Sequence, residues 1–143
     1  MITKEQWDGI ENALTGYFAR VKFRYQEREI IVSREGSGEG RRVLVVYVDG
    51  YIKGGWTFPD SESFDPIARD VWRERKKAYF SPAKKAKIIK EIGKRAAKRM
   101  FSNFDDVMIY YTPDFTSAKS LVRQFKKLEG VEIIPPNLDE IAS

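Results

Sequence analysis

The chain has 143 residues, with 26 Lys and Arg against 21 Asp and Glu, which gives a formal net charge of +5 at pH 7. It contains no His and no Cys, which excludes Ser-His-Asp and Cys-His catalysis, disulfides and zinc sites built from these side chains. Hydrophobic residues make up 42% and aromatic residues 13% of the chain, enough for one ordinary core. We therefore predict a single domain over residues 1–143.

A helix over about residues 4–19 is the first predicted element. Thr3 and Gln6 have the spacing of a capping box. The apolar residues that follow recur at helical spacing, and they are Trp7, Ile10, Leu14, Tyr17 and Phe18. The amino-terminal residues lack the apolar stretch of a signal peptide, and the longest apolar run, residues 43–48, is far too short to span a membrane. We expect a cytoplasmic protein with no membrane partner.

An antiparallel meander of four strands is predicted next. Residues 21–25 alternate between apolar and charged side chains, and residues 29–34, with the β-branched run of residues 30–32 at their centre, form a second strand. A third, more buried strand covers residues 43–48. Asp49-Gly50 is a strong hairpin signal, so residues 51–58 are expected to turn back as the fourth strand.

Helices then dominate until the last third of the chain. Asp65-Pro66 and Ser81-Pro82 each supply a cap followed by Pro, which predicts helices over residues 66–79 and from residue 82 to about residue 100.

A strand at residues 107–111, a helix at 116–128 and a strand at 131–134 complete the predicted fold. This order favours a right-handed parallel crossover if both strands join one sheet. The predicted class is α+β, with a four-stranded antiparallel meander, an N-terminal helix, a basic two-helix segment and a C-terminal β-α-β unit.

Positive charge is concentrated in residues 71–100, which carry twelve basic and two acidic residues, a net +10, while the rest of the chain is −5. On a helical projection of residues 82–100, Ile89, Ile92 and Ala96 share one face and the Lys residues take most of the other. We predict a core-facing helix with a positive outer face. The candidate nucleic-acid-binding residues are Arg73, Arg75, Lys76, Lys77, Lys84, Lys85, Lys87, Lys90, Lys94, Arg95, Lys98 and Arg99.

A nearly single-signed surface suits a polyanion, and nucleic acid is the leading candidate because the segment offers many contacts to phosphates. Trp72, Tyr79 and Phe80 lie among the cations and could stack on bases, although burial in a core is the more common fate of such residues. An acidic protein surface, another copy of the chain and an inert solvated face are the alternatives.

Two groups of residues resemble catalytic motifs only superficially. The glycine-rich stretch at residues 36–40 lacks the Lys-Ser/Thr ending of a phosphate-binding loop and leads into a strand. Asp60 with Glu74-Arg75-Lys76 has the residue types of a metal-dependent nuclease, but that site needs adjacent strands and Glu74 is predicted on a helix. We therefore predict a non-enzymatic protein with no cofactor and no metal site.

The segment YFSPAKKAKIIKEIGKRAAKRMF, residues 79–101, resembles basic helical segments of small phage and prophage accessory proteins. The resemblance covers about a sixth of the chain. It implies a viral accessory protein that binds nucleic acid or blunts a host enzyme or defence system. The alternative function is thus a phage-type inhibitor or adaptor that binds a host protein, through an exposed sheet face carrying Lys22, Arg24, Tyr51 and Trp56.

Overall fold

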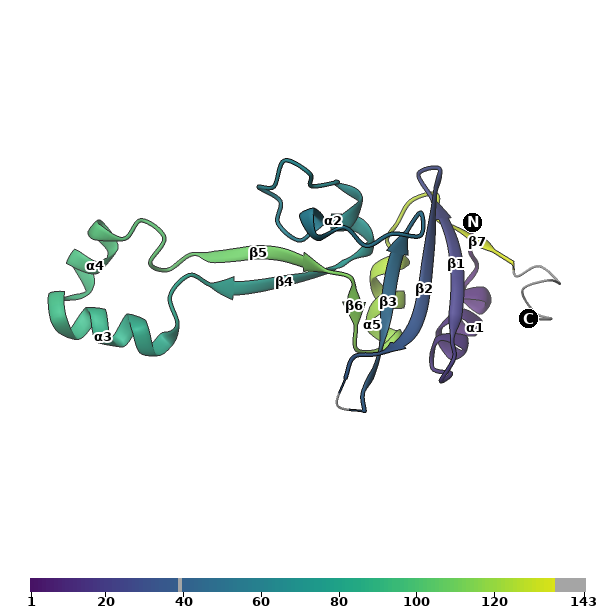
Figure 1. Cartoon of the computed structure of the whole chain (residues 1–143), viewed down its shortest axis with the longest axis horizontal. Coiled ribbons are helices and arrows are strands. Elements are labelled where there is room, and N and C mark those ends of the chain that lie inside the picture. The colour runs from purple at the N-terminus through teal and green to yellow at the C-terminus, as the bar shows by residue number, and fades with distance from the viewer. Residues whose placement is uncertain (39, 136–143) are drawn as a thin grey trace. The chain divides into compact units, whose positions relative to one another are not determined.

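The computed structural model describes residues 1–38 and 40–135. The chain is a mixed α+β protein with antiparallel sheets and an N-terminal helix, as predicted (Figure 1). Its contacts form two compact units, one made of Met1–Arg73 with Tyr111–Ser143 and the other of Glu74–Tyr110. We call the first the sheet unit and the second the basic unit. The single domain over residues 1–143 stays a prediction.

Five strands form the sheet of the sheet unit, in the order β6-β3-β2-β1-β7. Each strand is antiparallel to its neighbours. The strands are β1 (Arg20–Tyr25), β2 (Arg28–Gly36), β3 (Arg42–Val48), β6 (Asp114–Phe115) and β7 (Glu132–Ile134). Val32 lies opposite Val21 on one side and Val46 on the other. Because side chains alternate along a strand, this register gathers the buried residues of the central strands on one face.

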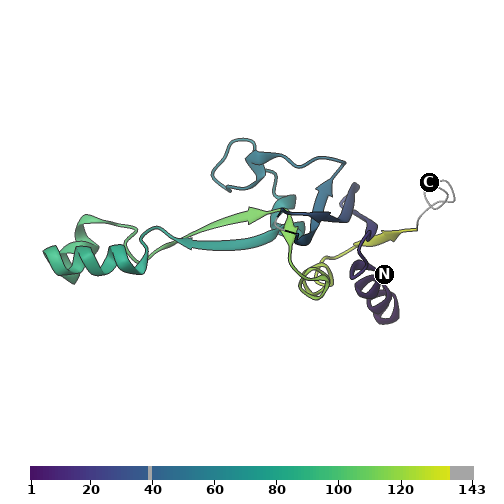
Figure 2. The ribbon, with the colours of Figure 1, turned by 60° about the horizontal axis from the view of Figure 1, so that its bottom comes forward.

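Two helices cover that face, α1 (Lys4–Leu14) and α5 (Ala118–Phe125). The ring of Phe23, on β1, stacks on Trp7 of α1 at 6.1 Å between centroids and meets Phe125 of α5 edge-on at 5.3 Å. Figure 2 shows both helices on the same side of the sheet. The main hydrophobic core therefore lies between the sheet and these two helices.

The predicted first helix starts correctly but is too long. Thr3 Oγ1 accepts a hydrogen bond from the Gln6 N–H at 3.1 Å, and Gln6 Oε1 accepts one from the Thr3 N–H at 2.8 Å, which confirms the capping box. The helix ends at Leu14 because Thr15 and Gly16 turn the chain, with their N–H groups bonded to carbonyls three residues back. Tyr17 and Phe18 consequently lie outside the helix and are 62% and 84% exposed.

The predicted fourth strand, residues 51–58, is wrong. Asp49 and Gly50 do form a tight turn with positive φ angles of 53° and 83°, but the returning chain makes only an isolated bridge between Val48 and Tyr51. Residues 54–56 are a short 3₁₀ helix, and β6 takes the place beside β3. The meander therefore has three strands.

The predicted strand–helix–strand crossover exists but begins elsewhere. Its first strand is β6, and the predicted strand at residues 107–111 instead belongs to a two-stranded sheet. The pairings place β6 and β7 at opposite edges of the main sheet, running in the same direction. α5 thus connects two edge strands across the width of the sheet.

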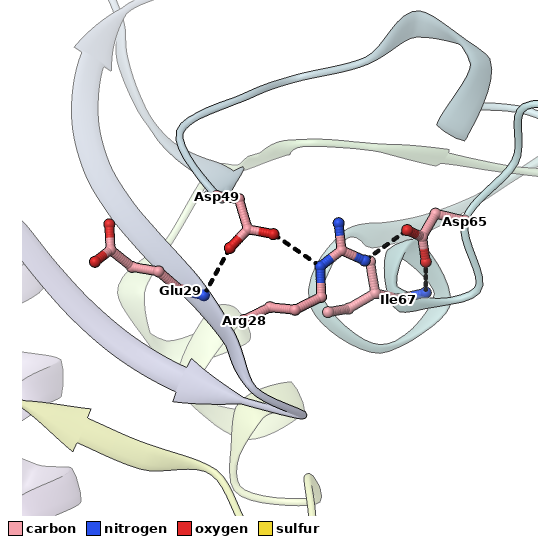
Figure 3. A network of polar contacts seen from close by, with 5 residues as sticks. All are labelled: Arg28, Glu29, Asp49, Asp65 and Ile67. Carbon is pink, nitrogen blue, oxygen red and sulfur yellow. Dashed lines mark hydrogen bonds and ion pairs between the residues drawn. The ribbon is translucent and has the colours of Figure 1, made fainter.

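Arg28 ties the start of β2 to two loops of the sheet unit (Figure 3). Its Nε donates to Asp49 Oδ2 at 3.0 Å, and its Nη1 donates to Asp65 Oδ2 at 2.5 Å. Asp49 also accepts from the Glu29 N–H at 3.0 Å, and Asp65 from the Ile67 N–H at 3.1 Å. The guanidinium charge of Arg28 is therefore paired with two carboxylates of the same unit.

The predicted helix at residues 66–79 is mostly a strand. Only α2 (Ile67–Val71) is helical, and β4 (Arg73–Ala78) follows it directly. Trp72, between them, has extended backbone angles of φ −97° and ψ 161° and is fully buried. Gln124 Nε2 donates to the carbonyl oxygens of both Asp70 and Trp72 at 2.8 Å. These contacts hold the chain out of the helical path.

Candidate nucleic-acid interface

The basic unit consists of a two-stranded ribbon and two helices. β4 pairs with β5 (Val107–Thr112), and the two arrows run in opposite directions in Figure 1. Between them lie α3 (Pro82–Ile92) and α4 (Lys94–Met100). The predicted single helix over residues 82–100 is therefore wrong, because Gly93 stands between the two helices with φ 85° and ψ 158°, outside the helical region.

The twelve predicted binding residues lie on three elements instead of two helices. Four of them are on β4, namely Arg73, Arg75, Lys76 and Lys77. Four are on α3, namely Lys84, Lys85, Lys87 and Lys90. The last four are on α4, namely Lys94, Arg95, Lys98 and Arg99. Arg73 belongs to the sheet unit and the other eleven to the basic unit.

Most of these side chains are exposed. Only Arg73, Arg75 and Lys85 are half-buried. Alternation along β4 places Arg73, Arg75 and Lys77 on one side of the strand, whereas the helical cations project over successive turns. The structure thus keeps most of the predicted residues exposed but presents them on a ribbon and two short helices.

The prediction of a core-facing helix is also wrong. α3 starts as predicted, with the Ser81 Oγ accepting a hydrogen bond from the Lys84 N–H at 3.2 Å. However, α3 contains no buried residue, and Ile89 and Ile92 are 37% and 41% exposed. In the two helices only Ala97 is buried. Their positions are therefore fixed by few apolar contacts.

A small aromatic cluster supplies the packing within the basic unit. Phe80 contacts Phe101 and Phe104 at centroid distances of 5.3 and 5.6 Å. Phe80 thus packs against other rings, as does Trp72 in the sheet unit, which contacts Trp56 at 5.6 Å. Of the three aromatics considered for stacking on bases, Tyr79 is the one with a large exposed area, at 49%.

Asp105 pairs with two of the predicted cations. Its Oδ1 lies 3.1 Å from Lys85 Nζ and its Oδ2 lies 3.3 Å from Lys98 Nζ. The hydrogen bond from Lys85, together with Lys98, holds the pKa of Asp105 below its ordinary value. Lys85 is in the first turn of α3, where the helix dipole disfavours a cation, and Asp105 offsets part of that cost.

The remaining cations of the basic unit make no ion pair with a carboxylate among the residues that the structure describes. Residues 74–110 contain eleven basic and four acidic residues, a net charge of +7, which leaves −2 for the rest of the chain. Such a surface attracts polyanions and releases their counterions on binding.

The prediction that Glu74, one of the nuclease-like residues, lies on a helix is wrong. Glu74 lies on β4 and not on a helix, so the structural reason given against such a site does not hold. Over residues 1–38 and 40–135, no group of three or more acidic side chains is placed to hold a metal ion. Within the same residues, no helix combines the length and the apolar character needed to cross a bilayer.

Comparison with protein families, curated proteins and solved structures gave no match to this chain.

Proposed function

We propose that this protein is a non-enzymatic, cytoplasmic accessory protein that binds nucleic acid through the cations of the basic unit. The observation that carries the proposal is the set of exposed Lys and Arg residues on β4, α3 and α4 that lack carboxylate partners among the described residues. A surface meant only for solubility normally mixes both signs of charge. The resemblance of residues 79–101 to phage accessory proteins is compatible with this role.

Phosphates are the expected ligands of this surface. Long, exposed Lys side chains reach phosphates without fixed geometry. Affinity from such contacts depends strongly on salt and weakly on sequence.

Titration against DNA and RNA at several salt concentrations tests the proposal. Contact with about five phosphates gives a log-log slope of affinity against salt near −4 to −5. Replacing Lys87, Lys90, Lys94 and Lys98 with Glu should abolish binding and flatten the slope. A matched control reverses the same amount of charge on exposed residues of the sheet unit, Lys119, Arg123, Lys126 and Lys127. The proposal would be contradicted if both variants lost the same amount of affinity for nucleic acid, or if the variant of the basic unit lost none.

An inhibitor or adaptor is the second candidate function, and one feature of the sheet unit favours it. The face of the sheet opposite the main core carries an open depression lined by Arg20, Ile31, Ser33, Glu35 and Tyr47. Trp56, suggested from the sequence as part of a protein-binding surface, is only 3% exposed and is not part of it. Under this function, a pull-down from a host extract recovers one protein regardless of nuclease treatment, whereas nucleic-acid binding is lost with nuclease.

A further inference from the structure

Two aromatic rings lie exposed side by side in the sheet unit. Tyr17 and Phe18 follow α1 and are 62% and 84% exposed. Their rings meet edge to face, with centroids 4.7 Å apart and planes at 82°. A single exposed aromatic residue is ordinary, but two rings in contact form a large apolar surface that costs free energy in water.

Arg42, at the start of β3, holds this pair in place. The guanidinium carbon lies 4.0 Å from the centroid of the Tyr17 ring and 5.8 Å from that of Phe18. Nε donates to the Tyr17 carbonyl oxygen at 3.1 Å, and Nη2 donates to the Arg34 carbonyl oxygen at 2.8 Å. The guanidinium is thus fixed by two backbone acceptors and a ring face. Because the Arg42 side chain is already ordered, it loses little conformational entropy when a ligand binds.

Basic residues flank the rings, in the chain after Phe18 and at the start of β3. Arg42 makes no ion pair with a carboxylate within the described part of the chain. Arg41 precedes it and Arg20 lies two residues after Phe18, and both are exposed. Cations beside exposed aromatic rings suit a nucleotide, whose base stacks on a ring while the positive charge attracts its phosphate.

We propose that Tyr17, Phe18 and Arg42 form a stacking platform for an unpaired base of a single-stranded nucleic acid. This inference rests on the proposed function, which supplies the class of ligand, a nucleic acid. The residues of the platform, however, lie in the sheet unit and not in the basic unit. It contacts bases, whereas the cations of the basic unit contact phosphates, which single and double strands share. The platform therefore supplies a preference for unpaired strands.

The test compares two ligands of equal charge. One is an oligothymidylate of about 20 nucleotides, and the other is an abasic phosphodiester of the same length. The full chain should bind the first about tenfold more tightly, because one stacked base contributes roughly that factor. Phe18→Ala and Tyr17→Ala should each remove most of this difference and leave binding of the abasic strand unchanged.

Two further variants sharpen the result. Tyr51→Ala removes another exposed aromatic side chain of the sheet unit, 63% exposed, and should bind both ligands as the unaltered chain does. Arg42→Lys keeps the charge but loses the planar group over Tyr17, and should weaken oligothymidylate binding alone. Thermal unfolding of each variant confirms that the fold is retained.

The outcomes separate this inference from the proposed function. If the unaltered chain binds both strands equally, or if Phe18→Ala and Tyr17→Ala bind oligothymidylate as tightly as it does, the platform does not stack bases and the inference is overturned. Loss of abasic-strand binding on reversing the four Lys residues of α3 and α4 would still support the proposed function. If that reversal leaves abasic-strand binding intact while Phe18→Ala weakens oligothymidylate binding, the platform stands and the role of the basic unit fails.

Discussion

The indole Nε1 of Trp72 donates a hydrogen bond to the backbone oxygen of Val46 at 3.1 Å, joining the end of α2 to the middle of β3. Both residues are fully buried. The bond fixes the point at which the chain leaves helical geometry and enters β4. The first cation of the ribbon, Arg73, is the next residue.

Replacing Trp72 with Phe should lower the free energy of unfolding for two reasons. The smaller ring packs less well, and the Val46 oxygen also loses a buried hydrogen-bond donor, which should cost about 1 to 3 kcal/mol in addition. Urea unfolding measures the change. Trp7→Phe is the matched control, since Trp7 is also buried and its indole N–H has no partner among the described residues. Equal destabilisation by the two substitutions would show that the hydrogen bond contributes nothing.

Replacing Arg28 with Met should destabilise the sheet unit by about 1 kcal/mol, because Asp49 and Asp65 lose their shared cation. All three side chains are partly exposed, at 28%, 47% and 31%, so solvent screens the pairs and the effect stays modest. Urea unfolding at neutral pH measures it. Arg24→Met, on the neighbouring strand, serves as the control and should be close to neutral.

The same carboxylates make stability depend on pH. The hydrogen bond from the Glu29 N–H, helped by Arg28, lowers the pKa of Asp49. Burial by itself raises the pKa of Asp65, but the Ile67 N–H and Arg28 outweigh it and the net shift is downward. A lowered folded pKa gives stability that is present above the ordinary value of 3.8 and is lost as pH falls through the folded pKa. The urea concentration at the midpoint of unfolding should therefore decrease as the pH is lowered below about 4. In Arg28→Met this decrease should be less steep. An equally steep drop would contradict the role of Arg28.

Replacing Asp105 with Asn should strengthen nucleic-acid binding several-fold, because it releases Lys85 and Lys98 for phosphates. The log-log salt slope should become steeper by about one to two. Asp106→Asn changes the net charge equally, but Asp106 makes no ion pair within the described residues. If both substitutions strengthen binding to the same extent, long-range charge and not the release of the two Lys residues is responsible.

Replacing Gly93 with Ala should destabilise the junction of α3 and α4 by about 1 to 3 kcal/mol, because its φ of 85° is unfavourable for a residue with a Cβ atom. Nothing lies within 4 Å of a Cβ placed there, so the cost comes from the backbone alone. Amide hydrogen exchange over residues 82–100 measures it. Gly9→Ala within α1 has equal space and ordinary angles, and should stabilise its helix by about 0.5 to 1 kcal/mol. Slower exchange in Gly93→Ala would show that the two helices can join.

Local signals in the sequence predicted some elements of the sheet unit correctly. The strand at residues 21–25, the turn at Asp49-Gly50 and the capping box at Thr3 each depend on contacts between near neighbours, and the structure contains all three, although no strand follows the turn. The errors came where distant residues decide. No local pattern shows that β6 occupies the edge beside β3.

The sequence by itself determined which residues are cationic and that their charge is concentrated in residues 71–100, because charge depends only on composition and order. Tertiary structure alone decided how these residues are presented. Trp72 leaves the helical path because burial and the bond to Val46 outweigh helical propensity. Residues 73–78 therefore form a strand, and Asp105 reaches Lys85 across 20 residues, a pairing that only folding can bring about.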